Sequence, residues 1–562
     1  MMNRREFVLS LSAALILSRS YSTIGQEFRC DVAVIGGGVG GYAAALAALR
    51  NGMRVVLTEE TDWLGGQLTA QAVPPDEHAW IEEFGSTASY RQYRRDVRDY
   101  YRKHFPLTET ARSNPYLNPG NGSVSRLTHE FGVSAKVLEE KLHPYLASGK
   151  LVILFHHVPE SATNRGDFIE SVTLRDIRTH DLRTVHADCF LDATELGDLL
   201  AIAGVESVTG AESHAATLEM SAPASAEPTH SQGIAYCFAM DYLEGEDHTI
   251  EKPESYGFWK NYQPQLVPAW TGRLLSWTSC TPSTLKPKIA ELTPNGKASN
   301  GFNDLWSFRR IADRGNFTTG TYHSDITLVN WPQNDFWLED LVTATAERRL
   351  QIIARARQLS LSLLYWMQTE APRPDGGSGF RGLRLRPDIT GTPDGLAKAA
   401  YIRESRRIRA EFTILQHHVD AELRQMMFKD PKLAGRAEVY ADSVGVGCYR
   451  LDLHPSVGGA NYLDRSCLPF QIPLGALLPI RVQNLIPACK NIGTTHISNG
   501  CTRLHPVEWN IGEAAGALAS FALIKKRLPR EVRSKPVLLQ DFQRSLVGQG
   551  FELEWPSQVH AV

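Results

Sequence analysis

The clearest pattern along the chain is an apolar, β-branched run at residues 30–35 that leads directly into a cluster of glycines. A continuous run of this kind predicts a strand that is buried on both faces. Residues 42–50 are alanine-rich and predict a helix that closes at Asn51 and Gly52. Residues 54–57 predict a second strand, with Glu59 at its end. The succession of strand, glycine turn, helix and strand predicts an α/β fold built on a parallel sheet.

The glycine turn carries the spacing G-x-G-x-x-G at Gly36, Gly38 and Gly41. The first glycine permits a tight turn, the second lets the backbone approach a pyrophosphate, and the third lets helix and strand pack closely. The helix N-terminus attracts phosphates, and Glu59, 23 residues after Gly36, can accept a ribose hydroxyl. These residues predict a dinucleotide site, although the fingerprint alone leaves FAD and NAD open.

The same glycine spacing recurs at Gly377, Gly379 and Gly382, but prolines precede it and no strand can end there. We therefore interpret the second match as a loop. A reductase with a dedicated nicotinamide domain would need another strand-glycine-helix unit, and the sequence shows none. We do not expect NAD bound in its own Rossmann domain.

Four motifs, in the same order along the chain, resemble the bacterial FAD-dependent oxidoreductase family. They are the N-terminal fingerprint with residues 64–66, the segment 192–198, the segment 401–407 and the segment 512–516. This family is related at the level of the fold to the fumarate reductase and succinate dehydrogenase flavoproteins. The resemblance implies FAD as the cofactor and a Rossmann-like FAD/NAD(P)-binding domain of three layers, with an inserted α+β substrate or cap domain.

The resemblance also implies which residues lie at the cofactor. In such flavoproteins a C-terminal helix points its N-terminus at the flavin, a role that would fall here on the start of a small-residue helix at Gly512. The segment that usually reads A-T-G reads Ala193-Thr194-Glu195 here, with a glutamate in place of the glycine that permits close backbone approach. Beyond the fingerprint, the expected cofactor residues are Gly65, Gly66, Asp192, Ala193, Thr194, Gly512, Glu513 and Gly516.

The motif positions predict an FAD domain that is interrupted along the chain. An amphipathic helix at 134–148 precedes a strand at 151–155, and Val158 is placed to meet an adenine. The middle of the chain is rich in aromatic residues and predicts long helices around 339–369 and 398–427. We expect an FAD-binding domain in two parts at 27–212 and 440–527, a substrate or cap domain at 213–439, and a tail at 528–562.

Oxidation by a flavin removes a hydride and a proton, so the protein must supply a base. Histidine is the natural base near neutral pH, and the candidates are His454, His496 and His505, all in the C-terminal FAD segment. We favour His505 and His454 as the catalytic residues; the alternative is that these histidines only hold the loops around the cofactor.

The segment 401–407 contains a dense charged cluster. If it is helical, Arg403 and Arg407 share one face and Glu404 can pair with them. We expect Arg403 and Arg407 to bind the substrate, with a salt-bridged surface helix as the alternative.

Composition excludes several other classes. The chain of 562 residues has 59 Lys and Arg against 62 Asp and Glu, a net charge of −3, so no basic footprint for nucleic acid is expected. Eight cysteines without any C-x-x-C pair do not indicate a disulfide scaffold or a cysteine-based zinc site. The adjacent His417 and His418 have no ligand partner at fixed spacing, so we expect no metal.

The N-terminus has the pattern of an export signal. Arg4 and Arg5 precede Phe7 and a modest apolar run at 9–17, as in a bacterial twin-arginine signal peptide. The run is too short to span a bilayer, which needs about 20 residues. We expect residues 1–25 to be a signal peptide read by the twin-arginine export machinery, and the protein to be periplasmic or extracytoplasmic.

Together these features predict an exported FAD-dependent oxidoreductase that transfers a hydride between flavin N5 and a small polar molecule, such as a sugar, a hydroxy acid or an amine. Its electron acceptor or donor is unknown. The alternative is a flavoprotein redox partner without a small-molecule substrate of its own. A flavin-dependent halogenase is disfavoured, because the sequence lacks W-x-W-x-I-P.

Overall fold

The computed structural model describes residues 26–296, 304–556 and 559. The expected signal peptide at 1–25 lies outside this range.

The largest sheet of the structure joins the N-terminal unit to two later pieces of the chain. Neighbouring parallel strands are, in order, β3 (Leu151–Phe155), β2 (Val55–Glu59), β1 (Gln26–Ile35), β6 (Leu182–Asp192) and β21 (Leu485–Pro487). Because β21 comes from the far end of the sequence, this α/β domain is discontinuous, as predicted.

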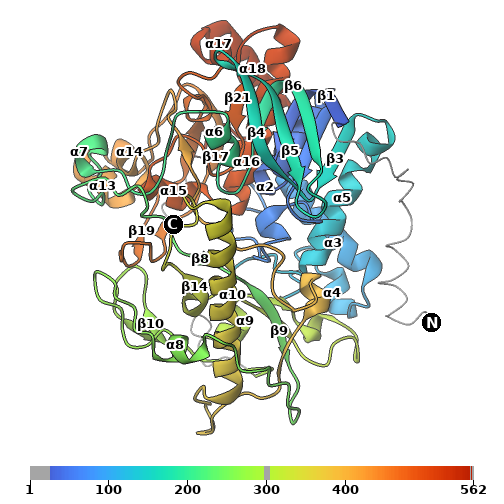
Figure 1. Ribbon diagram of the computed structural model, residues 1–562, viewed down its shortest axis with the longest axis vertical. Helices are drawn as coiled ribbons and strands as arrows, with labels where there is room; N and C mark the ends of the chain where they lie inside the picture. The colour runs from blue at the N-terminus through green and yellow to red at the C-terminus, as the bar shows by residue number, and fades with distance from the viewer. Residues whose placement is uncertain (1–25, 297–303, 557–558, 560–562) are drawn as a thin grey trace.

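The strand β6 carries two neighbours on one edge. Its N-terminal half pairs antiparallel with β5 (Phe168–Asp176), which pairs with β4 (His157–Arg165), while its C-terminal end pairs parallel with β21. Figure 1 shows these strands in the upper half of the molecule. Val32 and Val34 of β1 pack into the main core, whereas Ala33 and Ile35 pack into a second cluster with Val172 of β5. The predicted burial of both faces of β1 is confirmed.

Two helices cover the parallel strands on the face of the main core. They are α2 (Val39–Arg50) and α16 (His505–Lys525), which pack against each other and against the sheet. A Cβ on Gly512 would lie 1.9 Å from the Gly40 carbonyl oxygen, and one on Gly516 would lie 2.1 Å from that of Ala44. Glycine is therefore required at both places for the two helix backbones to meet.

The start of α16 corrects one expectation. The helix begins at His505, seven residues before Gly512, with Pro506 in its first turn. Gly512, Glu513 and Gly516 lie in the helix interior; the two glycines serve helix packing, and Glu513 pairs with Arg50 of α2. The helix N-terminus, with its partial positive charge, is therefore at His505 and Pro506.

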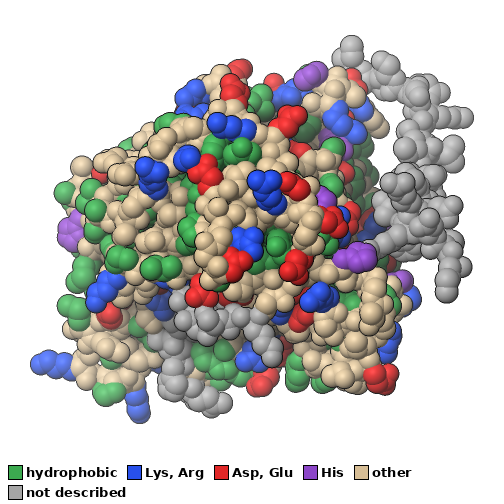
Figure 2. Space-filling model, turned by 90° about the horizontal axis from the view of Figure 1, so that it is seen from below, with side chains coloured by type: hydrophobic (Ala, Val, Ile, Leu, Met, Phe, Trp, Pro, Cys, Tyr) green, Lys and Arg blue, Asp and Glu red, His purple; other side chains and the backbone are tan. Residues whose placement is uncertain are grey.

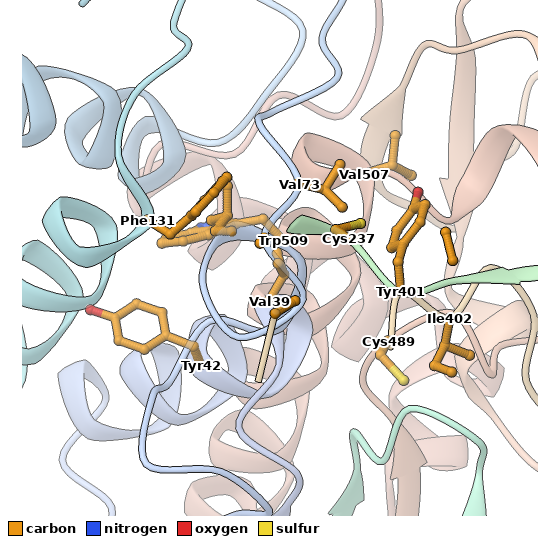
Figure 3. Packing of buried hydrophobic residues seen from close by; sticks show 14 of the residues in the cluster. Val39, Tyr42, Val73, Phe131, Cys237, Tyr401, Ile402, Cys489, Val507 and Trp509 are labelled. Atoms are coloured by element: carbon orange, nitrogen blue, oxygen red, sulfur yellow. The ribbon is translucent and has the colours of Figure 1, made fainter. Parts of the chain in front are cut away.

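Aromatic residues fill the space beside these helices. Figure 3 shows Val39 and Tyr42 of α2 together with Trp509 of α16 and Phe131, the first residue of α5 (Phe131–Ala147). The rings of Tyr42 and Trp509 are 5.4 Å apart. Further helices complete this part: α3 (Ala88–His104), α6 (Asp198–Ile202), α17 (Pro529–Ser534) and α18 (Pro536–Gly548).

The middle of the chain forms a separate antiparallel sheet. Its strand order is β12 (Arg310–Ala312), β13 (Ile326–Val329), β9 (Phe238–Tyr242) and β15 (Leu383–Leu385). The long helix α10 (Ala346–Thr369) lies in the same lower half of Figure 1 and matches the helix predicted around 339–369. The second glycine match, before β15, is a loop as expected.

The long helix predicted at 398–427 is wrong. Residues 399–406 are not helical, because their backbone pairs with other segments: Tyr401 N donates to the Ala235 carbonyl at 2.8 Å, and Ala399 N donates to that of Ala70 at 3.0 Å. The short strand β16 (Arg407–Ile408) and the helices α12 (Gln416–Val419) and α13 (Ala421–Met427) follow. Tertiary pairing here overrides the local helical propensity.

Two further observations concern the charges on the surface and the apolar character of the helices. Acidic and basic side chains are interspersed on the face that Figure 2 shows, where they are not sorted by sign. Among the helices of the described residues, none combines the length and the apolar character that crossing a membrane requires.

Candidate functional site

The glycine turn between β1 and α2 has the geometry of a phosphate-binding loop. Gly36 has a φ of +103°, and a Cβ there would lie 2.2 Å from the Ala193 carbonyl oxygen. A Cβ on Gly41 would lie 1.9 Å from the Gly36 oxygen. The N-cap residue of α2, Gly38, supplies no side-chain cap, and in the first turn Gly40 N donates to Glu508 Oε1 at 3.3 Å. The helix N-terminus, with its partial positive charge, is suited to an anion such as a pyrophosphate.

Glu59 lies at the end of β2, beside this turn. It is buried, and its carboxylate accepts hydrogen bonds from the backbone N–H of Gly37 at 3.2 Å and of Thr61 at 2.8 Å. Burial raises the pKa of Glu59 to about 7. Val158 lies just beyond the adjacent strand end, as the second residue of β4. Glu59 and Val158 therefore stand at the same edge of the sheet, where a ribose and an adenine would be expected.

A pair of glycines after β2 brings a second stretch of backbone into contact with the glycine turn. Gly65 and Gly66 have φ values of +109° and +47°, and Gly65 N donates to the Gly37 carbonyl at 2.8 Å. A Cβ on Gly66 would lie 2.8 Å from the Gly38 Cα. Close approach of the two backbones therefore depends on glycine at 66.

The segment 192–195 closes the turn from the end of β6. Asp192 is fully buried; it accepts hydrogen bonds from Thr194 N at 2.9 Å and Leu200 N at 3.0 Å, and burial raises its pKa to about 7. Its side chain thus holds the loop and the start of α6. Thr194 Oγ1 accepts a bond from Asp198 N at 2.7 Å, and Ala193 lies against Gly36.

Glu195, in the place of the usual glycine, faces the phosphate-binding turn. Its Oε1 lies 2.6 Å from the Cβ position of Gly38 and 3.0 Å from that of Gly66. Its carboxylate pairs with Lys490, which is fully buried and lies 3.6 Å from Glu508. Burial would lower the pKa of Lys490, but the two carboxylates outweigh it and raise the pKa. The lysine compensates the acidic charge that Glu195 brings next to the nucleotide site.

Of the predicted histidines, His505 is placed to donate rather than to act as a base. It is fully buried at the N-terminus of α16, and its Nδ1 accepts a hydrogen bond from Asp76 N at 3.1 Å. Burial and the neighbouring Arg309 lower its pKa to about 3, although Glu77 and the Val73 carbonyl oppose this. The neutral ring therefore carries its proton on Nε2; the Val73 carbonyl lies near the ring, but no hydrogen bond of ordinary geometry from Nε2 is present among the described residues. This environment is the opposite of what the prediction of His505 as a base requires.

His454 has the geometry that a base requires. Its Nδ1 lies 2.6 Å from Asp335 Oδ2, and its Nε2 lies 3.6 Å from Asp452 Oδ2. Asp335 is fully buried, whereas the His454 side chain is 21% exposed and so remains accessible. The Asp335 carboxylate accepts the Nδ1 proton and leaves Nε2 available for a proton from a ligand.

The two predicted substrate arginines have internal partners. Arg403 Nη2 donates to Asp335 Oδ1 at 2.8 Å, and Arg403 Nη1 donates to the Gly233 carbonyl at 2.6 Å. Arg407 is buried and bonded at every nitrogen, to Glu404, Glu212 and the carbonyls of Gly210 and Thr494. The two do not share a helix face. Arg407 holds the fold, while Arg403 positions Asp335.

The third histidine also lies outside this arrangement. His496 Nδ1 is 2.9 Å from Glu404, the residue that pairs with Arg407. Its contacts are those expected of a histidine that holds a loop.

Several residues that the motifs did not identify complete the buried site. Arg503 donates to the Tyr401 hydroxyl at 2.8 Å and to Asp452 Oδ2 at 3.0 Å. Arg309 lies 3.5 Å from Asp76. Burial would raise the pKa of Asp452, but His454, Arg503 and Arg403 hold it well below its usual value. Arg503 and Asp452 were within reach of sequence reasoning, since each lies two residues from a candidate histidine; Asp76, Arg309 and Asp335 carry no local signal.

The residues around the glycine turn fit FAD. The N-terminus of α2 suits the pyrophosphate, and the Glu59 carboxylate suits a ribose hydroxyl. Gln67, in the turn η1 (Gly66–Leu68), donates to the Arg503 carbonyl at 2.9 Å. It therefore links the nucleotide site to the buried cluster of Arg503, Asp452 and His454.

Solved structures similar to this chain show only distant likeness. A geranylgeranyl bacteriochlorophyll reductase-like protein from Thermoplasma acidophilum is 10% identical, with a TM-score of 0.32 over 94% of this chain and 85% of that one. L-proline dehydrogenase from P. horikoshii is 17% identical, with a TM-score of 0.17 over 34% and 25%. A flavin-dependent brominase is 15% identical, with a TM-score of 0.23 over 39% and 47%. The matched region spans less than half of the dehydrogenase and of the brominase.

Sequence comparison is more direct. The chain has no significant match among curated protein sequences. The sequence profile of the family described as FAD dependent oxidoreductase, however, matches residues 31–546, which is nearly the whole chain. This match includes the glycine turn, the Asp192 segment, the middle sheet and α16. The chain therefore belongs to the FAD-dependent oxidoreductase family, as an enzyme with FAD as its cofactor.

Proposed function

We propose that this enzyme transfers a hydride between a small polar substrate, such as a hydroxy acid, a sugar or an amine, and flavin N5. When bound, FAD supplies the two-electron redox chemistry, and the protein must handle the proton. The observation that carries the proposal is the Asp335–His454 pair, at 2.6 Å, beside the buried Arg503–Asp452 pair. We assign the middle region at 213–439 as the cap, because it contributes Asp335.

His454 is the proposed base. With its Nδ1 proton held by Asp335, the Nε2 atom accepts the proton of a substrate hydroxyl or amine. Asp452, 3.6 Å from Nε2, then stabilises the imidazolium that forms. His505 serves the same site as a neutral donor through Nε2. In the reverse direction His454 returns the proton.

The second candidate function is a redox partner without its own small-molecule substrate. The enclosure of His454 and Asp452, whose side chains are 21% and 17% exposed, favours a small molecule over a docked protein. The test is the visible spectrum of the purified enzyme without oxygen, before and after sugars, hydroxy acids, amino acids and amines are added. Bleaching of the flavin band by one class supports the proposal, whereas bleaching only by a reduced protein partner supports the alternative.

Export is part of the proposal. The paired Arg4 and Arg5 before Phe7 support a twin-arginine signal and an extracytoplasmic location. Twin-arginine export carries folded proteins, which suits an enzyme that acquires FAD before it leaves the cell. Replacing both arginines with lysine should retain the protein inside the cell. Unchanged export of that variant would refute this part.

A further inference from the structure

Arg309 is a buried guanidinium with unused donors. It lies between α9 (Leu305–Phe308) and β12, and its side chain is 12% exposed. Its Nη2 lies 3.5 Å from Asp76, while its Nε and Nη1 have no hydrogen-bond partner among the described residues. Leaving buried polar groups without partners costs free energy, so such groups indicate a place for a ligand.

The unused donors belong to the site of the proposed reaction. Asp76, the partner of Arg309, donates its backbone N–H to His505 Nδ1 at 3.1 Å. Asp76 also interacts electrostatically with Arg503 and Asp452, which in turn lies 3.6 Å from His454 Nε2. Arg309 and the proposed base are therefore parts of one cluster.

The unpaired side-chain atoms of Arg309, Arg503 and His505 share one chemical character. They are Arg309 Nε, Arg309 Nη1, Arg503 Nε and His505 Nε2, and all four are nitrogen donors. An unpaired acceptor, Gln67 Oε1, lies on the nucleotide side, where its own amide nitrogen donates to Glu508 at 2.6 Å. A group that satisfies several donors from two guanidinium groups must be rich in acceptors and is best negatively charged.

We propose that Arg309, with Arg503 and His505, binds the carboxylate of the substrate, so that the substrate is a small hydroxy acid or amino acid. This inference rests on the proposed function and narrows it. A simple amine brings further donors where acceptors are needed, and a sugar hydroxyl is a weaker acceptor for a guanidinium group than a carboxylate is. A carboxylate supplies two acceptor oxygens in a geometry that matches the guanidinium group.

The test measures binding rather than turnover. The FAD-loaded enzyme is titrated by calorimetry with malonate and with malonamide, its neutral counterpart of the same shape. We expect malonate to bind and malonamide to bind at least tenfold more weakly. Arg309→Gln should weaken malonate binding at least tenfold, while Arg348→Gln, on the exposed face of α10, should leave it unchanged. Equal binding of the two compounds, or unchanged affinity in Arg309→Gln, would overturn the inference.

Two further variants protect the test against misfolding. Arg309→Lys keeps the charge with fewer fixed donors and should bind malonate with intermediate affinity. Asp76→Asn removes the carboxylate that competes for Arg309 and should bind malonate as well as the wild type or better; a loss there would contradict the inference. Flavin reduction by sugars without malonate binding would refute the inference alone, and malonate binding without any flavin reduction would refute the proposed function alone.

Discussion

His454 Nδ1 lies 2.6 Å from Asp335 Oδ2, across 119 residues of sequence. The histidine comes from the C-terminal part of the chain, and the aspartate comes from β14 (Asp335–Phe336) in the middle region. Asp335 is itself fixed by Arg403 at 2.8 Å. Folding therefore creates an oriented imidazole that neither segment contains alone, and the proposed chemistry depends on it.

The first prediction concerns this pair. His454→Gln should lower the rate of substrate-dependent flavin reduction roughly 100- to 10,000-fold, because the proton has no acceptor. Bound FAD should be retained, since His454 does not touch the glycine turn. Anaerobic stopped-flow absorbance measures the rate, and protein-bound absorbance measures the FAD. His496→Gln is the matched control and should keep most of the rate; full activity in His454→Gln would remove the residue as the base.

Asp335→Asn should change the pH dependence as well as the rate. The amide cannot hold the Nδ1 proton as a carboxylate does, so the correct tautomer of His454 is no longer favoured. We expect a lower rate and a shifted pH profile of flavin reduction. A uniform loss of rate with an unchanged profile would indicate a merely structural role for Asp335.

His505 gives a second prediction, about stability and pH. Its folded pKa is about 3, below the ordinary histidine value of 6.5. The unfolded chain therefore takes up a proton at this residue first as the pH falls. The stabilising contribution of the neutral ring is complete above pH 6.5 and is lost towards pH 3, by at most about 1.4 kcal/mol per pH unit. Chemical denaturation at pH 7 and pH 5 should show a smaller loss of stability in His505→Gln than in the wild type; an equal or larger loss would contradict the assignment.

Helix packing gives a third prediction. Gly512→Ala places a Cβ 1.9 Å from the Gly40 carbonyl oxygen, so α16 and α2 must separate. We expect a loss of stability of about 3 kcal/mol or more, together with FAD loss because the N-terminus of α2 is displaced. Gly132→Ala in α5 is the control, since a Cβ there meets nothing within 4 Å. Thermal unfolding and FAD content of the two variants distinguish packing from a general intolerance of alanine.

The buried lysine gives a fourth prediction. Lys490→Met leaves Glu195 and Glu508 uncompensated next to the glycine turn, so stability should fall by about 3 kcal/mol and the bound fraction of FAD should fall with it. Adding Glu195→Gln removes one of the two charges and should restore part of the FAD binding. Equal FAD content in the wild type and Lys490→Met would show that the lysine does not compensate the site.

Local patterns indicated the glycine turn because its parts are close together in the sequence. The strand, the glycine turn, the helix and Glu59 lie within a short stretch of sequence. The signal for each of them is therefore carried by adjacent residues. The start of α16 was missed, although Pro506 is a residue typical of a first helical turn. The small residues from Gly512 onward, which indicated a helix start, are instead explained by the contact with Gly40 and Ala44, which no sequence pattern shows.

The buried site was harder to predict because its residues are assembled by the fold. Arg403 was singled out for its charge, but its partner Asp335 has no neighbouring signal. Two nitrogens of Arg309 have no hydrogen-bond partner among the described residues, and only this feature of the folded chain draws attention to the residue. His454 and His505 appeared equivalent in sequence; burial and the hydrogen bond from Asp76 separate them. Pairing at a distance and desolvation decide these roles, and both arise only in the folded chain.

The most direct test of the account is the isotope effect on flavin reduction. The acid that bleaches the flavin fastest without oxygen is compared with the same acid carrying deuterium at the carbon that is oxidised. We predict a primary isotope effect in the wild type and slow reduction in His454→Gln at neutral pH. Two results would contradict hydride transfer from a small substrate. The first is that no small molecule reduces the flavin. The second is that deuterium does not slow the reduction even in His454→Gln at saturating acid, where the chemical step should limit the rate.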